Sequence, residues 1–320
     1  GGPPQREHVG VVRAGDDSGG QGASPVGREG RPLISPRRSV SSLEVLRLEP
    51  GLRAGRKDQV AVEEPLEIRV EFTSREGPKR MPVAVTMRTP GEDFELAAGF
   101  LFTEGILSAR EEIREISYCQ GEGPQEYNVL SARFHDGVRL DTGLFTRNFY
   151  TSSSCGVCGK ASIEAVEVRG CPVLPSGEPV LHPRVLDDLP RRLRRNQPVF
   201  ERTGGLHAAG LFDTLGNLRV LREDVGRHNA VDKVVGHGLL EGVLPYSDGI
   251  LVVSGRTSFE IIQKALMAGI PAVVAVGAPS SLAVDLAREF NQTLVGFARG
   301  GGFNVYAGKK RVQEWEKEEG

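Results

Sequence analysis

The fold of this chain is decided by the stretch Ile250-Leu-Val-Val-Ser-Gly-Arg-Thr-Ser-Phe-Glu-Ile-Ile-Gln-Lys-Ala-Leu-Met-Ala-Gly-Ile-Pro-Ala-Val-Val-Ala-Val276 and its continuation to residue 297. Short apolar runs alternate here with segments of helical period. The pattern predicts strands over residues 250–254, 272–276 and 293–297, and helices over 257–267 and 280–290. Strands that alternate with helices pair in parallel, and the helices cover the sheet. The stretch therefore predicts an α/β fold.

The segments before this stretch predict further strands and helices. Two apolar runs flank the turn Asp213-Thr-Leu-Gly-Asn217, a pattern typical of a hairpin. Near residue 90, Thr89 is expected to cap a helix and Pro90 to lie in its first turn. The other expected elements are strands over 60–72, 83–87, 113–118 and 127–134 and helices over 183–195 and 227–236, with 161–168 left open between helix and strand.

Composition divides the chain into four regions. Gly, Pro, Ser and Arg dominate the first 40 residues and apolar residues never recur with a period, so residues 1–50 are expected to be a disordered tail. A smaller N-terminal α+β subdomain is expected over residues 51–150, and the main α/β domain over 151–308. Residues 309–320 are predicted to form a charged C-terminal tail.

Bulk properties limit the partners and the compartment. The chain has 320 residues, of which 40 are Lys or Arg and 42 are Asp or Glu. This near balance argues against a general nucleic-acid-binding protein, which would be clearly basic. The longest nearly apolar run, residues 269–278, is too short to cross a membrane, and the N-terminus lacks the apolar segment of a secretory signal. We therefore expect a cytoplasmic protein with neither nucleic acid nor membrane as a partner.

Two cysteines lie three residues apart in the polar stretch Thr151-Ser-Ser-Ser-Cys-Gly-Val-Cys-Gly-Lys160. Four interpretations of Cys155 and Cys158 remain open: a structural zinc site, a redox pair, a buried structural pair and a sulfur carrier. A zinc site needs four ligands, yet the chain has no second C-x-x-C. The Ser and Gly neighbours disfavour the redox and buried pairs. A sulfur carrier needs an exposed, partly ionised thiol, and Lys160 favours the thiolate.

The second candidate segment is Thr203-Gly-Gly-Leu-His-Ala-Ala209. A histidine together with a C-x-x-C invites comparison with zinc nucleobase deaminases, which need H-x-E before P-C-x-x-C. Here Ala209 stands in place of the glutamate, and the cysteines precede His207. A metal site is therefore not predicted. His207 is either a hydrogen-bonded histidine near a strand end or a residue that acts beside the cysteines.

Two strand-to-helix junctions have the composition of phosphate sites. In the first, Arg227, His228 and Asn229 lie near a helix N-terminus, where they could hold phosphate or a purine edge. In the second, the turn Ser254-Gly255-Arg256 could hold phosphate through backbone N–H groups, although it lacks the G-K-[ST] ending of a P-loop. The simpler interpretation of both junctions is helix capping with solvated charges.

A glycine-rich segment, Gly296-Phe-Ala-Arg-Gly-Gly-Gly-Phe-Asn-Val-Tyr306, completes the candidates. Its three consecutive glycines allow a close backbone approach to a ligand. Phe297 or Phe303 could stack on a base, and Arg299 could meet phosphate. The alternative is a flexible hairpin between two strands.

Together these segments resemble one family, the FdhD-type formate dehydrogenase accessory sulfurtransferases, over residues 58–306. The motifs are the Thr89-Pro-Gly-Glu-Asp93 helix start with Gly99-Phe-Leu-Phe-Thr-Glu-Gly105, Ser154-Cys-Gly-Val-Cys-Gly159, Thr203-Gly-Gly-Leu-His-Ala-Ala209, Arg222-Glu-Asp-Val-Gly-Arg-His-Asn-Ala-Val-Asp-Lys233, Ser254-Gly-Arg-Thr-Ser-Phe-Glu260 and the Phe-Asn-Val-Tyr306 ending. The resemblance implies a three-layer α/β/α sheet similar to the cytidine deaminase fold, usually in a homodimer.

The resemblance also implies a function. Such proteins accept sulfur from a cysteine desulfurase and transfer it to the molybdenum or tungsten bis(molybdopterin guanine dinucleotide) cofactor of formate dehydrogenase. Cys155 would hold the persulfide with Cys158 as its partner, and the cofactor would lie on residues 297–302 and Phe303. The alternative is a non-catalytic carrier or chaperone of that cofactor. The predicted cofactor-binding residues are Phe297, Ala298, Arg299, Gly300, Gly301, Gly302, Phe303, Asn304, Ser254, Gly255, Arg256, His207, Arg227, His228 and Asn229.

Overall fold

The computed structural model describes residues 12–13, 38–119, 127–138 and 171–315. Its C-terminal part is built on a six-stranded sheet of order β13-β12-β11-β10-β8-β9. The three central strands pair in parallel, whereas β8, β9 and β13 join the sheet in antiparallel fashion. The strands are β8 (His207–Phe212), β9 (Leu218–Asp224), β10 (Ile250–Val253), β11 (Ala272–Ala275), β12 (Thr293–Gly296) and β13 (Asn304–Ala307). The predicted parallel pairing and the predicted hairpin are thus confirmed.

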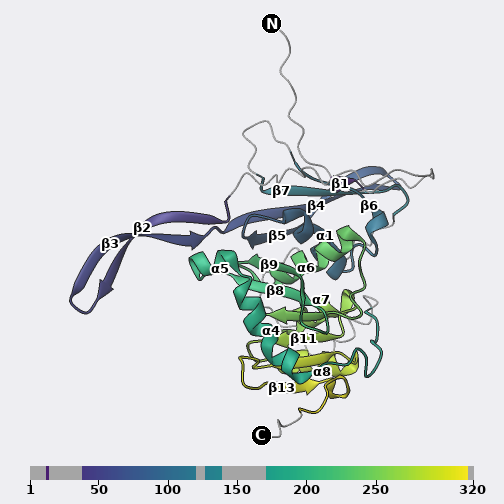
Figure 1. The fold of residues 1–320 in the computed structure, drawn as a ribbon. Coiled ribbons are helices and arrows are strands. Elements are labelled where there is room, and N and C mark those ends of the chain that lie inside the picture. The colour runs from purple at the N-terminus through teal and green to yellow at the C-terminus, as the bar shows by residue number, and fades with distance from the viewer. Residues whose placement is uncertain (1–11, 14–37, 120–126, 139–170, 316–320) are drawn as a thin grey trace, which may run out of the picture.

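Helices cover both faces of this sheet (Figure 1). On one face, α4 (Pro183–Arg195) buries Leu186, Leu189 and Leu193 against strand residues such as Phe212 and Val252. This spacing of three and four residues is the apolar stripe of an amphipathic helix. The other face packs against α6 (Arg227–Glu241), α7 (Phe259–Met267) and α8 (Ser281–Glu289), and the short helix α5 (Pro198–Thr203) follows α4.

The N-terminal part contains a second, five-stranded sheet of order β1-β6-β7-β4-β5, and a helix packs on it. Buried residues of the sheet, including Leu66, Ile68 and Leu130, pack against Leu96 and Leu101 of the helix. The elements are β1 (Val12–Arg13), β4 (Glu64–Ser74), β5 (Gly77–Arg88), α1 (Asp93–Thr103), the 3-10 turn η1 (Arg110–Glu112), β6 (Ile113–Tyr118) and β7 (Val129–Phe134). The protein is therefore a mixed α/β structure with several sheets, as predicted at that level.

The start of α1 differs from the prediction. The helix begins at Asp93, and its N-cap is Glu92 in the left-handed region, with φ of 51° and no side-chain cap hydrogen bond. Thr89 instead docks on β9: its N–H donates to Asp224 Oδ2 at 3.2 Å, and its Oγ1 accepts from Val225 N at 3.2 Å. A tertiary contact therefore takes the place of the local helix cap, and Thr89 joins the two parts of the molecule.

Helices α1 and α6 lie between the two sheets and cross at glycines (Figure 1). A Cβ atom at Gly99 would lie 1.8 Å from the carbonyl oxygen of Asp232, and one at Gly236 would lie 1.8 Å from that of Glu95. Only glycine permits backbones to approach this closely. Ion pairs link the same two parts, among them Lys264 with Glu104 at 3.3 Å and Arg222 with Glu95 at 2.5 Å.

Parts of both predicted tails belong to regular elements of the structure. Residues 40–49 form the strand β2 (Val40–Glu49), which pairs along its whole length with β3 (Leu52–Ala61). This hairpin extends away from the rest of the molecule as a two-stranded arm (Figure 1). Most of its side chains are exposed, so pairing between the two strands stabilises the hairpin more than burial does. A strand without a buried face has no need of alternating apolar residues, which is why the sequence did not predict it.

The C-terminal region is described to residue 315. Over these residues it is hydrogen-bonded to the α/β part. Arg311, in the 3-10 turn η2 (Lys309–Arg311), is 2% exposed and donates to the carbonyl oxygens of Glu178 and Asn291. Gln313 N also donates to Leu181 O at 3.0 Å. None of the helices that the structure describes has the length and apolar content to span a membrane.

Candidate functional site

The topology brings most of the predicted binding residues to one edge of the six-stranded sheet. The carboxyl ends of the parallel strands β10, β11 and β12 meet there, and so do the start of β8 and the end of β9. The loops after the parallel strands are hydrogen-bonded to one another: Gly277 N donates to Gly255 O at 3.1 Å, and Phe297 N donates to Gly277 O at 3.1 Å. Ligands of open α/β sheets bind at this edge.

His207, Arg227 and Gly255 form the centre of this edge. A Cβ atom at Gly255 would lie 3.4 Å from His207 Nδ1 and 4.0 Å from Arg227 Cδ, so the glycine turn packs directly against both side chains. Burial, followed by the charge of Arg227, lowers the pKa of His207 below its ordinary value of 6.5. Neighbouring Ser254 uses its Oγ to accept a hydrogen bond from Ala208 N at 2.9 Å, which fixes the turn to β8.

His228 lies one residue further, in the first turn of α6. Its Nε2 is 3.1 Å from Ser258 Oγ and 3.7 Å from Glu260 Oε2. Burial, assisted by the charge of Arg227, lowers the pKa of His228 to about 4. Since burial and a nearby cation both disfavour the imidazolium, this histidine is neutral near pH 7.

Arg227 therefore supplies positive charge at the centre of the edge. Its Nε is buried, and among the residues that the structure describes it has no hydrogen-bond partner. No carboxylate of the described ranges forms an ion pair with this guanidinium either. Two neutral histidines beside an arginine at the N-terminus of a helix make an environment that suits an anion such as phosphate.

Asn229 differs from its neighbours because its amide is fully engaged inside the protein. The Nδ2 group donates to Met87 O at 2.8 Å and to Asp224 Oδ1 at 2.9 Å, and Oδ1 accepts from Thr86 Oγ1 at 3.2 Å. The bonds with Met87 and Thr86 attach α6 to β5 of the other sheet. The structure thus separates Asn229 from Arg227 and His228, although the three are consecutive.

The glycine-rich segment forms the loop between β12 and β13. Gly300, Gly301 and Gly302 all have positive φ, of 86°, 86° and 138°. Beside them, Phe297 is 40% exposed, and the guanidinium carbon of Arg299 lies 5.7 Å from its ring centre. An exposed ring next to a cation is suited to stacking on a base.

Several other predicted binding residues, in this segment and beside it, already have contacts within the protein. Ala298 is buried and donates through its N–H to Ala275 O at 3.1 Å. The ring of Phe303 lies 5.7 Å from that of Trp315, and Asn304 Nδ2 is 3.5 Å from Tyr306 Oη. Arg256 is exposed, and the backbone of Gly277 packs against its side chain.

Sequence reasoning missed one residue at this loop, Asp187 of α4. Its carboxylate accepts from Gly301 N at 3.0 Å and from Gly302 N at 2.9 Å. No local signal could have found it, since Asp187 is more than a hundred residues away and one of several charged residues on an amphipathic helix.

The predicted catalytic residues Cys155 and Cys158 lie outside the described residues. The two other cysteines are poor candidates for a reactive thiolate. Cys171 is buried in the core of the α/β part. Cys119 is half-buried at the end of β6, and burial raises the pKa of its thiol above the ordinary value of 9.0. A raised pKa reduces the thiolate fraction at neutral pH.

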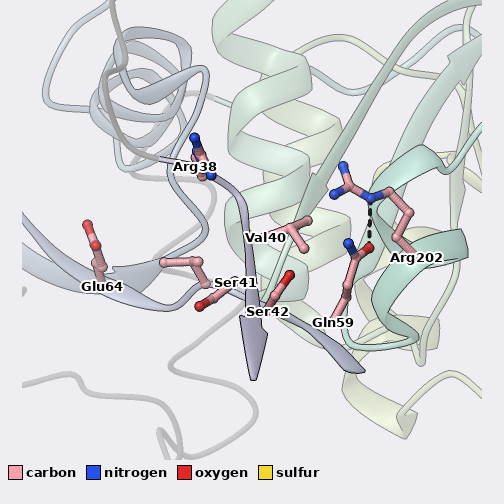
Figure 2. A pocket seen from close by; sticks show the side chains of 8 residues that line it. Arg38, Val40, Ser41, Ser42, Gln59, Glu64 and Arg202 are labelled. Carbon is pink, nitrogen blue, oxygen red and sulfur yellow. Dashed lines mark hydrogen bonds between the residues drawn. The ribbon is translucent and has the colours of Figure 1, made fainter. Parts of the chain in front are cut away.

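The described ranges also contain a polar cavity of about 730 Å³ at the base of the β2–β3 hairpin. Figure 2 shows Arg38 and Arg202 on its two sides, with Gln59 hydrogen-bonded to Arg202 at 3.0 Å. None of the predicted site residues lines this cavity. Within the same ranges no cluster of three or more His, Cys, Asp or Glu is arranged to hold a metal ion.

Comparison with known proteins gives a consistent result. Residues 61–313 match the model of the FdhD/NarQ family. A sulfur carrier protein FdhD from Streptomyces avermitilis is 53% identical over 273 residues, 84% of this chain and 94% of that protein. The protein of the same name from Mycobacterium tuberculosis is 50% identical, covering 80% of this chain and 92% of that one. A crystal structure described as a formate dehydrogenase accessory protein from Desulfotalea psychrophila matches with a TM-score of 0.65 at 27% identity, covering 86% of this chain and 100% of that chain.

Proposed function

This chain belongs to the FdhD/NarQ family, and from that premise we propose that it is a sulfurtransferase that carries sulfur as a persulfide on Cys155. The observation that supports this most directly is the name of its relatives, sulfur carrier protein FdhD, at half or more identity over most of the chain. The C-x-x-C segment falls inside the matched range 61–313. The burial of Cys119 and Cys171 leaves Cys155 and Cys158 as the thiols best suited to the task.

The proposed reaction begins with a cysteine desulfurase that carries a persulfide. The Cys155 thiolate attacks the outer sulfur, a new S–S bond forms on Cys155, and the donor's cysteine leaves as a thiolate. The acceptor is the bis(molybdopterin guanine dinucleotide) cofactor with molybdenum or tungsten, which is the substrate of the second step and is destined for formate dehydrogenase. A cytoplasmic homodimer is part of the same proposal.

The carboxyl edge of the six-stranded sheet is the proposed binding site for this cofactor. A guanine dinucleotide has phosphates and a base, and the edge offers a group for each. Arg227 provides a guanidinium whose Nε has no hydrogen-bond partner in the described part of the chain, the glycine loop provides backbone N–H groups, and Phe297 provides an exposed ring. Helices on both faces of the sheet are consistent with a fold of the cytidine deaminase type, which we include in the proposal.

The direct test is mass spectrometry of the chain after incubation with a cysteine desulfurase and cysteine. We expect the peptide with Cys155 to gain the mass of one sulfur atom and the peptide with Cys119 to gain none. In a strain without its own copy of the gene, Cys155→Ala should abolish formate oxidation, whereas the matched variant Cys119→Ser should support it.

One result would overturn this assignment. If Cys155→Ala supports formate oxidation as well as the unmodified chain does, Cys155 carries no essential sulfur. If Cys155→Ala supports activity and variants of the glycine loop abolish it in the same assay, the protein is a non-catalytic cofactor carrier or chaperone.

A further inference from the structure

The glycine loop of residues 300–302 has the geometry of an anion-binding nest. Its three residues have φ between 86° and 138°, and the successive N–H groups of Gly301 and Gly302 point toward one side, since both donate to the same carboxylate. A Cβ atom at any of the three would meet no atom within 4 Å, so the loop is open to solvent. Such a concavity attracts negatively charged oxygens because its N–H donors are held in fixed positions.

An anion from the protein itself occupies this nest. Asp187 places both carboxylate oxygens on consecutive N–H groups, Oδ2 on Gly301 and Oδ1 on Gly302, at 3.0 and 2.9 Å. Within the described ranges no lysine or arginine forms an ion pair with Asp187. The next residue, Asp188, behaves differently and pairs with Arg191 and with Arg192, the latter at 2.7 Å. Among the residues that the structure describes, the loop N–H groups are therefore the hydrogen-bonding partners of the Asp187 carboxylate.

The flanks of the loop are fixed, whereas the bonds to Asp187 lie at the surface. On one side Ala298 is hydrogen-bonded to β11, and on the other Phe303 packs on Trp315. The two bonds to the carboxylate are exposed or part-buried, so solvent competes with them. A diphosphate has more charge and more acceptor oxygens than a carboxylate and can replace it on the same donors.

We propose that Asp187 is a latch that occupies the diphosphate position of this loop and must be displaced when a nucleotide diphosphate binds. This inference rests on the proposed function, because it concerns the loop at which the guanine dinucleotide cofactor is proposed to bind. The Asp187 latch lowers the affinity of the loop for its ligand and keeps other small anions out. A latch closed about nine-tenths of the time weakens apparent binding about tenfold.

The test uses guanosine diphosphate as the probe and isothermal titration calorimetry at one fixed salt concentration. Asp187→Asn removes the charge with little change of shape, and Asp187→Ala removes the acceptor altogether. Asp188→Asn is the matched control, since it changes the net charge equally on the same helix without touching the loop. We expect both Asp187 variants to bind about tenfold more tightly than the unmodified chain and the Asp188→Asn variant to bind with unchanged affinity.

Hydrogen exchange of residues 299–303 provides a second measurement. The ligand-free Asp187→Asn chain should exchange faster there than the unmodified chain, and guanosine diphosphate should restore protection. Two results would overturn the proposal: binding by the Asp187 variants that is equal to or weaker than that of the unmodified chain, or absence of binding in all four proteins. Sulfur loading of Cys155, measured by mass spectrometry, should be the same in all four, so failure of the latch is distinguishable from failure of the sulfur carrier.

Discussion

The crossing of α1 and α6 gives the sharpest stability prediction, because two general effects oppose each other there. Alanine is a better helix former than glycine by about 1 kcal/mol, so helix propensity alone predicts that Gly236→Ala stabilises the protein. The new Cβ, however, would lie 1.8 Å from the carbonyl oxygen of Glu95 and 2.7 Å from Gly99 N. Both are backbone atoms, so no side chain can turn away to relieve the clash.

The size of the effect follows from the distance. The carbonyl would have to retreat by roughly 1.6 Å from the added Cβ to reach ordinary contact at 3.4 Å. Overpacking in a tight core costs about 1–3 kcal/mol, occasionally more, and a backbone clash belongs at the upper end. After the gain in propensity, we expect Gly236→Ala to lower the free energy of unfolding by about 2 kcal/mol, and Gly99→Ala to lower it by a similar amount.

Urea denaturation followed by circular dichroism measures this quantity. The matched control is Gly55→Ala on β3, where an added Cβ meets nothing within 4 Å, and we expect a change within about 0.5 kcal/mol. The double variant Gly99→Ala/Gly236→Ala should lose less than the sum of the single losses, because one separation of the helices relieves both clashes. A gain of stability in Gly236→Ala would refute this reasoning, since helix propensity would then exceed the cost of the clash.

Two further predictions concern buried charge and pH. Lys264 and Asp232 form a buried ion pair at 2.9 Å. Lys264→Met leaves the Asp232 carboxylate buried without this cation, so it should lower the free energy of unfolding by about 3–5 kcal/mol in urea denaturation, whereas Lys264→Met/Asp232→Leu should lower it by less. An equal loss in both variants would contradict this account. The pKa of His228 is about 4 in the folded chain, against 6.5 in the unfolded chain, so the folded chain binds fewer protons between these values. The free energy of unfolding should therefore fall as the pH drops from 6.5 to 4, and His228→Gln should flatten this part of the profile; identical slopes would show that other groups cause it.

Much of the α/β part could be predicted because its signals are local. The apolar runs 250–254 and 272–276 and the helical period between them need only neighbouring residues to be recognised. Once these strands pair in parallel, their carboxyl ends meet, which explains why Ser254, Gly255 and Phe297 lie at the same edge of the sheet. Their role in cofactor binding stays a prediction. The assignment of sulfur to Cys155 stays a prediction, because the segment lies outside the described residues.

The structure differs from the local expectation where a distant partner takes the place of a local one. Thr89 is of a residue type that commonly caps helices, yet it hydrogen-bonds to Asp224 and Val225 of the other part of the chain. Asn229 is of a residue type that often binds ligands at the start of a helix, yet its amide donates hydrogen bonds to Met87 and Asp224. In both cases the residue type was informative and the partner was not encoded nearby.

The amino-acid sequence by itself determined the order of strands and helices in the α/β part, because periodicity and turn residues act over a few positions. Only the tertiary structure decided that Asp187 occupies the glycine loop, that Arg227 lies between two neutral histidines, and that α1 and α6 touch through glycine. These contacts join residues far apart in the chain. They depend on how whole elements pack against each other, which no local pattern of residues records.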